Sequence, residues 1–210
     1  DLPIVTDDET AAPPKKAVFL GSTRHSLALI GDNSFKPDSL GSDGFRIVAR
    51  GESVILYGSP KRGALYAAYD FLERFAGCRW YASWHCVTPR IDRLLVPANW
   101  DDTQKPAFEM RQPYWYDINR NQDFAARLRV NGFNHIKGPI DLKYGGDDFR
   151  FGGGLSSCHT FNLLLPPDEF FDSHPEYFSL VKGKRRKKHS QLCLTNPDVL
   201  RIVTERVLER

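Results

Sequence analysis

The segment 111–119 has the residue types of a sugar-binding site. It reads Arg-Gln-Pro-Tyr-Trp-Tyr-Asp-Ile-Asn, so one guanidinium, three aromatic rings, a carboxylate and two amides fall within nine positions. Aromatic faces suit the flat C–H patches of a sugar ring, and the polar groups can hydrogen-bond its hydroxyls. The candidate substrate-binding residues here are Arg111, Trp115, Asp117 and Asn119. The spacing is equally consistent with an alternative, in which the three rings only pack against a neighbouring domain and bind no sugar.

Two other patterns are weaker candidates for chemistry. The glycines at 145–146 and 152–154 lack both the Lys-Ser/Thr ending and the GxGxxG spacing of phosphate-binding loops, so they predict a flexible loop. Cys158 and His159 are adjacent, and in an extended segment neighbouring side chains point to opposite faces. We therefore do not expect them to act as a nucleophile and its base.

The four cysteines do not form a recognisable metal or redox motif. Cys78, Cys86, Cys158 and Cys193 contain no CxxC pair, so a closed zinc site is not expected. Two disulfides are arithmetically possible. We expect neither a metal nor a cofactor.

Charge is concentrated in one short stretch. The net charge of +3 comes from 29 basic and 26 acidic residues, and six of the basic ones lie between positions 182 and 188. Without that stretch the acidic residues are in excess, so the sequence predicts a solvated basic turn and no nucleic-acid partner. No run approaches the roughly 18 apolar residues of a membrane span, so no transmembrane segment is expected.

The elements up to residue 97 predict an α+β domain. A strand is expected at 17–21, a hairpin at 44–49 and 54–57, and a further strand at 78–81. Between them, Ser59 as N-cap and Pro60 in the first turn predict a helix that ends at Gly77. The residues expected on its buried face are Leu65, Ala68, Tyr69, Leu72, Phe75 and Ala76.

A polar segment at 99–106 predicts a domain boundary, after which the pattern changes. A strand at 108–111, a helix at 121–131 and a strand at 133–137 predict a βα unit of a parallel sheet. The residues expected on the buried face of that helix are Phe124, Ala125 and Leu128.

The last fifty residues predict short elements around the basic turn. A helical piece should begin at Pro166-Pro167, and strands at 177–181 and 191–195 should flank the turn. A helix capped by Asn196 should then run to the end of the chain. Its expected apolar stripe is Leu200, Val203, Val207 and Leu208. Because this stripe still needs a partner at Arg210, we expect the fold to continue beyond the chain.

Several motifs resemble known glycosidases. The runs 58–73 (GSPKRGALYAAYDFLE) and 77–81 (GCRWY) resemble the small domain that precedes the catalytic barrel in bacterial β-hexosaminidases and α-glucuronidases. The runs 158–161 (CHTF), 174–178 (HPEYF) and 191–197 (QLCLTNP) resemble a bacterial family whose characterised members are endo-β-N-acetylglucosaminidases of glycoside hydrolase family 163. This resemblance covers the chain from about Ala17 onward.

The resemblance implies a domain organisation. After a tether at 1–16, an α+β accessory domain would occupy 17–105, and 106–210 would be the N-terminal part of a (β/α)8 barrel of the TIM type. Such barrels take about 250 residues, so the barrel would be incomplete here. By the same resemblance, Arg111 would grip sugar hydroxyls at the end of the first barrel strand, and His159 would be a second substrate contact.

The function implied is that of a retaining glycoside hydrolase that acts on β-linked N-acetylglucosamine in glycans, exported to the periplasm or the cell surface. Such hydrolysis needs a pair of groups flanking the scissile bond. The nearby carboxylates, of Asp117, Asp141, Glu169 and Glu176, have no partner assignable from the sequence, so the catalytic pair is expected beyond Arg210. One alternative is a non-catalytic carbohydrate-binding or interaction module, and another is a structural remnant produced by truncation. Oligomeric state is left open.

We expect residues 1–210 alone not to hydrolyse an aryl N-acetyl-β-glucosaminide or a complex N-glycan, because no carboxylate pair is identifiable in them. The assay is release of the aryl group or of free glycan by the purified chain. Turnover that a single Asp or Glu substitution abolishes would contradict this expectation.

Overall fold

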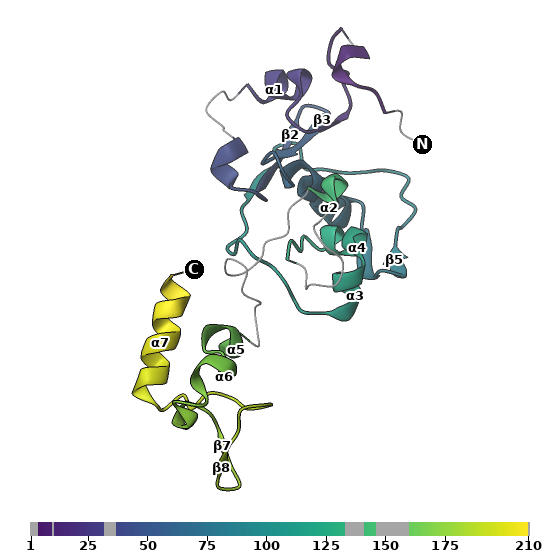
Figure 1. Cartoon of the computed structure of the whole chain (residues 1–210). Helices are drawn as coiled ribbons and strands as arrows, with labels where there is room; N and C mark the ends of the chain where they lie inside the picture. Colours follow the sequence, from purple (N-terminus) through teal and green to yellow (C-terminus); the bar gives the residue numbers. More distant parts are fainter. Residues whose placement is uncertain (1–3, 10, 32–36, 133–140, 146–159, 210) are drawn as a thin grey trace. The chain divides into compact units, whose positions relative to one another are not determined.

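The computed structural model describes residues 4–9, 11–31, 37–132, 141–145 and 160–209 (Figure 1). The chain falls into two compact units, Asp1–Phe149 and Arg150–Arg210. In the parts described, every helix is too short or too polar to traverse a bilayer.

A four-stranded mixed sheet is the centre of the first unit. Its order is β1-β3-β2-β6, with β1 at Val18–Leu20, β2 at Phe45–Arg50, β3 at Ser53–Gly58 and β6 at Asp101–Gln104. Strands β2 and β3 pair antiparallel from Phe45↔Gly58 to Arg50↔Ser53, which confirms the predicted hairpin. Strand β1 runs parallel to β3, and β6 antiparallel to β2.

Helices cover both faces of this sheet, as Figure 1 shows for α1 (Arg24–Ile30) and α2 (Gly63–Phe75). Successive strand residues point to opposite faces, so each strand supplies two cores. The core on the α2 side contains Phe45, Ile47, Val54, Leu56, Tyr66, Ala67 and Phe71. The core on the α1 side contains Phe19, Ile30, Val48, Ile55 and Tyr57. The sequence predicts only one of these helices, α2.

Helix α1 has a complete set of end signals that the sequence analysis missed. The Thr23 hydroxyl accepts from Ser26 N at 3.1 Å, and Thr23 N donates to Ser26 Oγ at 2.8 Å. This is a capping box in which Ser replaces the usual Glu or Gln. At the other end Gly31 has φ of 63°, a left-handed conformation that glycine adopts readily.

Helix α2 begins three residues later than predicted, at Gly63. Ser59 is not its N-cap, because the Ser59 hydroxyl donates to Ser42 O at 2.6 Å and Ser59 N donates to Gly44 O at 2.9 Å. The backbones of three glycines converge here, and a Cβ on Gly58 would lie only 2.4 Å from Gly44 O and 2.8 Å from Gly63 Cα. The close approach sets where the helix can begin.

The predicted buried face of α2 is also wrong. The buried residues include Tyr66, Ala67, Asp70 and Phe71, whereas the Leu72 side chain is 38% exposed. Asp70 can be buried on this face because its carboxylate lies 2.7 Å from the guanidinium of Arg74 and 3.8 Å from that of Arg129. The predicted Leu65 and Phe75 pack at the edge of the core, and Tyr69 packs edge-on against Trp80.

The polar segment 99–106 is not a linker, because it supplies strand β6. Its register with β2 runs from Phe45↔Gln104 to Val48↔Asp101, and the Arg46 guanidinium binds the Asp101 carboxylate at 2.8 Å. An edge strand can carry polar side chains, which also discourage pairing with other chains. The predicted domain bounds stay a prediction.

A second hairpin and two short helices complete the first unit. The hairpin consists of β4 (Arg79–Ala82), which confirms the strand predicted at 78–81, and β5 (His85–Val87). The helices are α3 (Tyr116–Arg120) and α4 (Gln122–Arg127), with a 3-10 turn at Leu142–Tyr144. Helix α4 is shorter than the helix predicted at 121–131. Its core contains Ile118, Phe124 and Ala125, with Trp80, Leu128 and Val130 packed against it.

The structure does not contain the strand predicted at 108–111. The strand predicted at 133–137 and most of the glycine-rich loop lie outside the described residues. The residues described form a mixed α/β structure with no closed barrel, so the (β/α)8 barrel stays a prediction.

The second unit is built from short elements around one core. These are α5 (Phe161–Leu164), α6 (Pro167–Phe170), a 3-10 turn at Pro175–Tyr177, β7 (Leu180–Val181), β8 (Lys184–Arg185) and α7 (Pro197–Leu208). The core contains Leu165, Tyr177, Phe178, Leu192 and Val199. An isolated bridge joins Phe178 to Leu192, and the strand predicted at 177–181 is reduced to β7.

The predicted cap of helix α7 is confirmed, but its predicted apolar stripe is wrong. The Asn196 side chain accepts from Asp198 N at 2.9 Å. Val199 is buried with Val203 packed beside it, whereas Leu200 is 64% exposed and Leu208 80% exposed. Of the predicted stripe, only Val203 contacts the core described here.

Phe71→Ala should lower the free energy of unfolding by about 3–5 kcal/mol, because it opens a cavity in the α2 core. Leu72→Ala, one position further on the same helix, should cost less than about 1 kcal/mol because its side chain is partly exposed. Denaturant unfolding of both variants measures the difference. Equal losses would mean that the helix face is assigned incorrectly.

Candidate functional site

Arg111 lies in a polar network centred on the buried carboxylate of Asp43, whose residue is 3% exposed. One oxygen of Asp43 accepts from Arg62 Nε at 2.6 Å. The other accepts from Asn131 Nδ2 at 2.8 Å and from Arg111 Nη2. A single carboxylate thus binds the start of α2 to two segments on either side of α3 and α4.

The remaining donors of Arg111 also have backbone partners. Its Nε donates to Arg129 O at 2.8 Å, and its Nη1 donates to Phe108 O at 2.9 Å. The Arg111 backbone N donates to Asn131 Oδ1 at 2.8 Å. These bonds account for the missing strand at 108–111, since they fold this segment against 129–131. They give Arg111 a structural role, and the sugar-binding role stays a prediction.

The network shifts the pKa values of two buried groups. Burial alone would raise the pKa of the Asp43 carboxyl, but hydrogen bonds from Arg111 and Arg62 hold it below the ordinary value of 3.8. Burial and the nearby Asp43 charge raise the pKa of Tyr66 to about 12. Asp43 is therefore ionised and Tyr66 neutral near pH 7.

Asp117 and Asn119 are buried in α3 instead of facing a cleft. Asp117 is 5% exposed and Asn119 6% exposed. Asp117 Oδ2 accepts from Ser83 N at 2.9 Å, and its Oδ1 accepts from Asn121 Nδ2 at 2.6 Å. Asp117 therefore fastens the turn of the β4–β5 hairpin to α3.

This contact brings two groups of exposed aromatic residues together. Trp84 directly follows Ser83, and Tyr116 directly precedes Asp117. We define the aromatic surface as Tyr81, Trp84, Tyr114, Trp115 and Tyr116, with exposures of 60%, 79%, 61%, 43% and 64%. Of the predicted site residues, Trp115 belongs to it, whereas Arg111, Asp117 and Asn119 bind structural partners or are buried.

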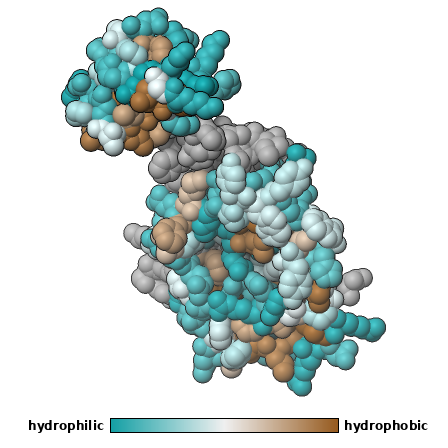
Figure 2. Space-filling view, turned by 90° about the horizontal axis from the view of Figure 1, so that it is seen from below, coloured by the Kyte–Doolittle hydropathy of each residue, from teal (hydrophilic) through white to brown (hydrophobic). Residues whose placement is uncertain are grey.

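Three of these rings are held by neighbours. Tyr81 stacks on His85 at 5.8 Å between ring centroids, and Trp115 packs edge-on against Phe124 at 5.6 Å. The Arg120 guanidinium lies 4.3 Å from the centre of the Tyr116 ring. The face in Figure 2 shows apolar residues in separate small groups among hydrophilic ones. Exposed rings, three of them supported in this way, therefore lie on two segments that the bond between Ser83 and Asp117 joins.

Trp84 and Tyr81 are not among the site residues predicted from the sequence. The pattern that could have indicated them is Trp-Tyr-Ala-Ser-Trp-His at 80–85, in which aromatic residues lie on both sides of a tight turn. The bond between Ser83 and Asp117 brings this turn next to the segment 114–116, a contact that the sequence does not reveal.

The other predicted groups do not add a catalytic pair among the residues described. His159 and Cys158 lie outside them. The Asp141 carboxylate accepts from Lys143 N at 3.1 Å, Glu169 binds Arg206 at 2.7 Å, and Glu176 binds His174 at 3.0 Å. The Asp117 carboxylate accepts hydrogen bonds from Ser83 and Asn121. Each candidate carboxylate that we named therefore has a structural partner.

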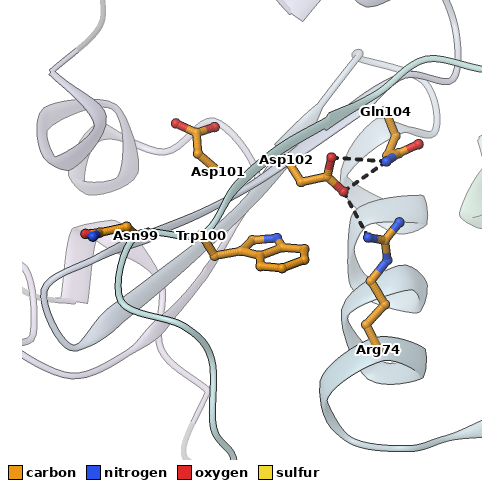
Figure 3. Close-up of a pocket in the computed structure, with 6 residues that line it drawn as sticks. All are labelled: Arg74, Asn99, Trp100, Asp101, Asp102 and Gln104. Atoms are coloured by element: carbon orange, nitrogen blue, oxygen red, sulfur yellow. Dashed lines mark hydrogen bonds and ion pairs between the residues drawn. The ribbon is translucent and has the colours of Figure 1, made fainter.

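A surface hollow of about 340 Å³ lies beside β6 (Figure 3). It is lined by Arg74, Asn99, Trp100, Asp101, Asp102 and Gln104. Asp102 accepts from Arg74 at 3.0 Å and from Gln104 at 2.9 Å, and Asp101 points away from them in Figure 3. Asp102 binds Arg74, and Asp101 binds Arg46. Because both acids of the hollow are paired and no lining residue belongs to the aromatic surface, we give it no role in glycan binding.

No metal centre is found in the described part of the chain, where no group of three or more His, Cys, Asp or Glu side chains is placed to hold an ion. Cys78, Cys86 and Cys193 have free thiols, and the possible pairing of Cys158 lies outside the described residues.

A family model for a domain of unknown function, DUF4838, matches residues 80–210. The chain belongs to the DUF4838 family. The DUF4838 region begins at the β4–β5 hairpin and contains every residue of the aromatic surface. No curated protein matches the chain. No solved structure matches it either.

Asp43→Asn should destabilise the chain by about 3–5 kcal/mol at pH 7, because it leaves two arginines beside a neutral group in a buried site. The lowered pKa of Asp43 means that its contribution is present above pH 3.8 and is lost as the pH falls through the lowered value. Denaturant unfolding at several pH values should therefore show the gap between wild type and variant shrinking in acid.

Asp38→Asn is the control, because Asp38 is an exposed carboxylate in the same part of the chain. It should change stability by less than about 0.5 kcal/mol. A gap for Asp43→Asn that stays constant with pH would contradict the assigned pKa direction.

Proposed function

We propose that this DUF4838 chain binds glycans containing β-linked N-acetylglucosamine through the aromatic surface, as the substrate-binding part of a glycoside hydrolase. The observation that carries the proposal is the pair of aromatic segments joined by the bond between Asp117 and Ser83. The resemblance to endo-β-N-acetylglucosaminidases supports the choice of sugar and of reaction, and with it the proposal that the protein is exported to the periplasm or the cell surface.

The exposure of these rings supports binding over packing. Burying an aromatic side chain stabilises a protein by about 1.5–3 kcal/mol. Several rings left in solvent on adjoining segments therefore do not contribute that stability to the fold. Exposed rings gathered on adjoining segments are typical of interaction sites. The equal choice between packing and binding that the sequence left open therefore shifts towards binding for Tyr114, Trp115 and Tyr116.

The chemistry of the rings fits an acetamido sugar. The C–H face of the sugar ring and the acetamido methyl group can pack on indole and phenol faces, while Arg120 and His85 at the same surface can hydrogen-bond hydroxyls. Three rings are held by His85, Phe124 and Arg120, so less side-chain freedom would be lost on binding.

Hydrolysis rests on the motifs and not on this surface. In the second unit, Tyr177 and Phe178 of the HPEYF run and Leu192 of the QLCLTNP run are core residues, so these motifs have structural roles here. The carboxylates that we named have partners of their own. This observation favours a second candidate, a carbohydrate-binding module without catalysis, which would bind the same glycans and leave them intact.

Trp84→Ala and Trp115→Ala should each weaken binding of N-acetylglucosamine oligosaccharides by about 2 kcal/mol, or roughly 30-fold, as expected for central aromatic contacts. Calorimetric titration of the chain measures this loss, and thermal unfolding checks that the variants fold. Leu95→Ala is the control, since it removes a 67% exposed aliphatic side chain without a ring.

The proposal is overturned if wild type does not bind the oligosaccharides, or if both tryptophan variants bind as tightly as the control. Equal binding of glucose oligosaccharides would overturn the choice of the acetamido sugar. Incubation of the oligosaccharides with the longest natural form of the protein separates the two candidates, because only a hydrolase releases shorter products.

A further inference from the structure

The second unit carries a cationic hairpin, which we define as residues 180–188. Strands β7 and β8 pair through Leu180↔Arg185 and Val181↔Lys184. Lys182 and Gly183 form the turn with φ of 51° and 74°, the two left-handed positions typical of a tight type I′ turn. Figure 1 shows the hairpin projecting away from α5 and α7 of its own unit.

The basic side chains of the hairpin divide into two sets. Arg185 Nη1 donates to Phe178 O at 2.6 Å, and Lys187 Nζ lies 3.4 Å from Asp168 and 3.5 Å from Asp172. The second set is exposed and has no ion pair among the described residues: Lys182, Lys184, Arg186 and Lys188. Lys184 and Arg185 are successive residues of β8 and point to opposite faces, so Arg185 binds its own unit while Lys184 is exposed.

Among the described residues of this unit, the carboxylates that form ion pairs do so with other groups. Glu169 binds Arg206, and Asp198 and Glu205 both bind Arg201. Asp168 and Asp172 bind Lys187, and Glu176 binds His174. The projecting tip is therefore a concentrated positive charge that an anionic partner would complement.

The uncharged neighbours of these cations indicate the kind of partner. Leu180 is 59% exposed and Val181 38% exposed. The cationic hairpin contains no aromatic residue, and the preceding Tyr177 and Phe178 are buried, so no ring of theirs can stack on a nucleic-acid base or a sugar. Cations beside exposed aliphatic groups suit a lipid interface, where phosphates meet the charges and acyl chains meet the aliphatic groups.

We propose that the cationic hairpin docks this chain onto a surface of anionic phospholipid. The four exposed cations contribute the electrostatic attraction, and Leu180 and Val181 enter the boundary between headgroups and acyl chains. This docking is peripheral and depends on salt, because screening shortens the reach of the charges. It does not rest on the proposed glycan binding.

The test is co-sedimentation of the full chain with vesicles of phosphatidylcholine alone or mixed with phosphatidylglycerol. We expect binding to the mixed vesicles only, and weaker binding as salt is added. Replacing Lys182, Lys184, Arg186 and Lys188 together by Gln should reduce partitioning by at least roughly 100-fold, since each cation near an anionic surface contributes about fivefold. Val181→Ser should weaken the binding that persists at high salt.

The matched control replaces four exposed cations of the first unit, Lys15, Lys16, Arg90 and Arg93, by Gln, which gives the same net charge. It should bind the mixed vesicles within about twofold of wild type, because these cations lie outside the hairpin. The proposal is overturned if the control and the hairpin variant bind equally, or if wild type binds neutral vesicles as well as anionic ones. Tighter binding to duplex DNA than to the mixed vesicles would overturn the lipid as partner. Because wild type is measured against both lipid compositions, a hairpin variant that fails to fold does not remove the test.

Discussion

The Asp43 carboxylate is the constraint on which the first unit depends. Moving a carboxylate out of water costs several kcal/mol, and the cost is offset only where charges and hydrogen-bond donors surround the group. Asp43 obtains them from Arg62, Arg111 and Asn131, which come from three different segments. Separating the sheet layer from the segments around α3 and α4 would therefore leave buried charges without partners, so the first unit should behave as one cooperative body.

That constraint explains which features the sequence could predict. The β2–β3 hairpin and the Asn196 cap depend on residues within a few positions of one another, and local patterns predicted both. The start of α2 depends on Gly44, and the structural role of Arg111 depends on Asp43, 68 positions away. No local pattern carries that information. The burial of Asp70 on α2 depends in part on Arg129, which comes from a distant segment, in addition to Arg74 on the same helix.

The candidate site shows the same division. The sequence identified Tyr114, Trp115 and Tyr116 from their types alone, and the structure leaves them exposed. It also assigned binding roles to Asp117 and Asn119, whose side chains are buried. A carboxylate beside aromatic residues can contact a sugar or hold a neighbouring turn, and the choice depends on whether a backbone N–H is nearby. Here Ser83 N is that donor, and it adds Trp84 to the surface that the sequence had outlined from one side.

The convergence of Gly44, Gly58 and Gly63 has a consequence for how the chain tolerates change in length. Because the backbones of Gly58 and Gly63 already touch, residues 59–62 form a loop whose two ends meet. Doubling the length of a flexible loop costs only about 0.6 kcal/mol in closure entropy. An insertion at the tip of this loop should therefore lower the stability only slightly. A single methyl group at its base would instead separate the hairpin from α2. At this corner of the fold, added chain length should change the stability little, whereas added side-chain volume should lower it strongly.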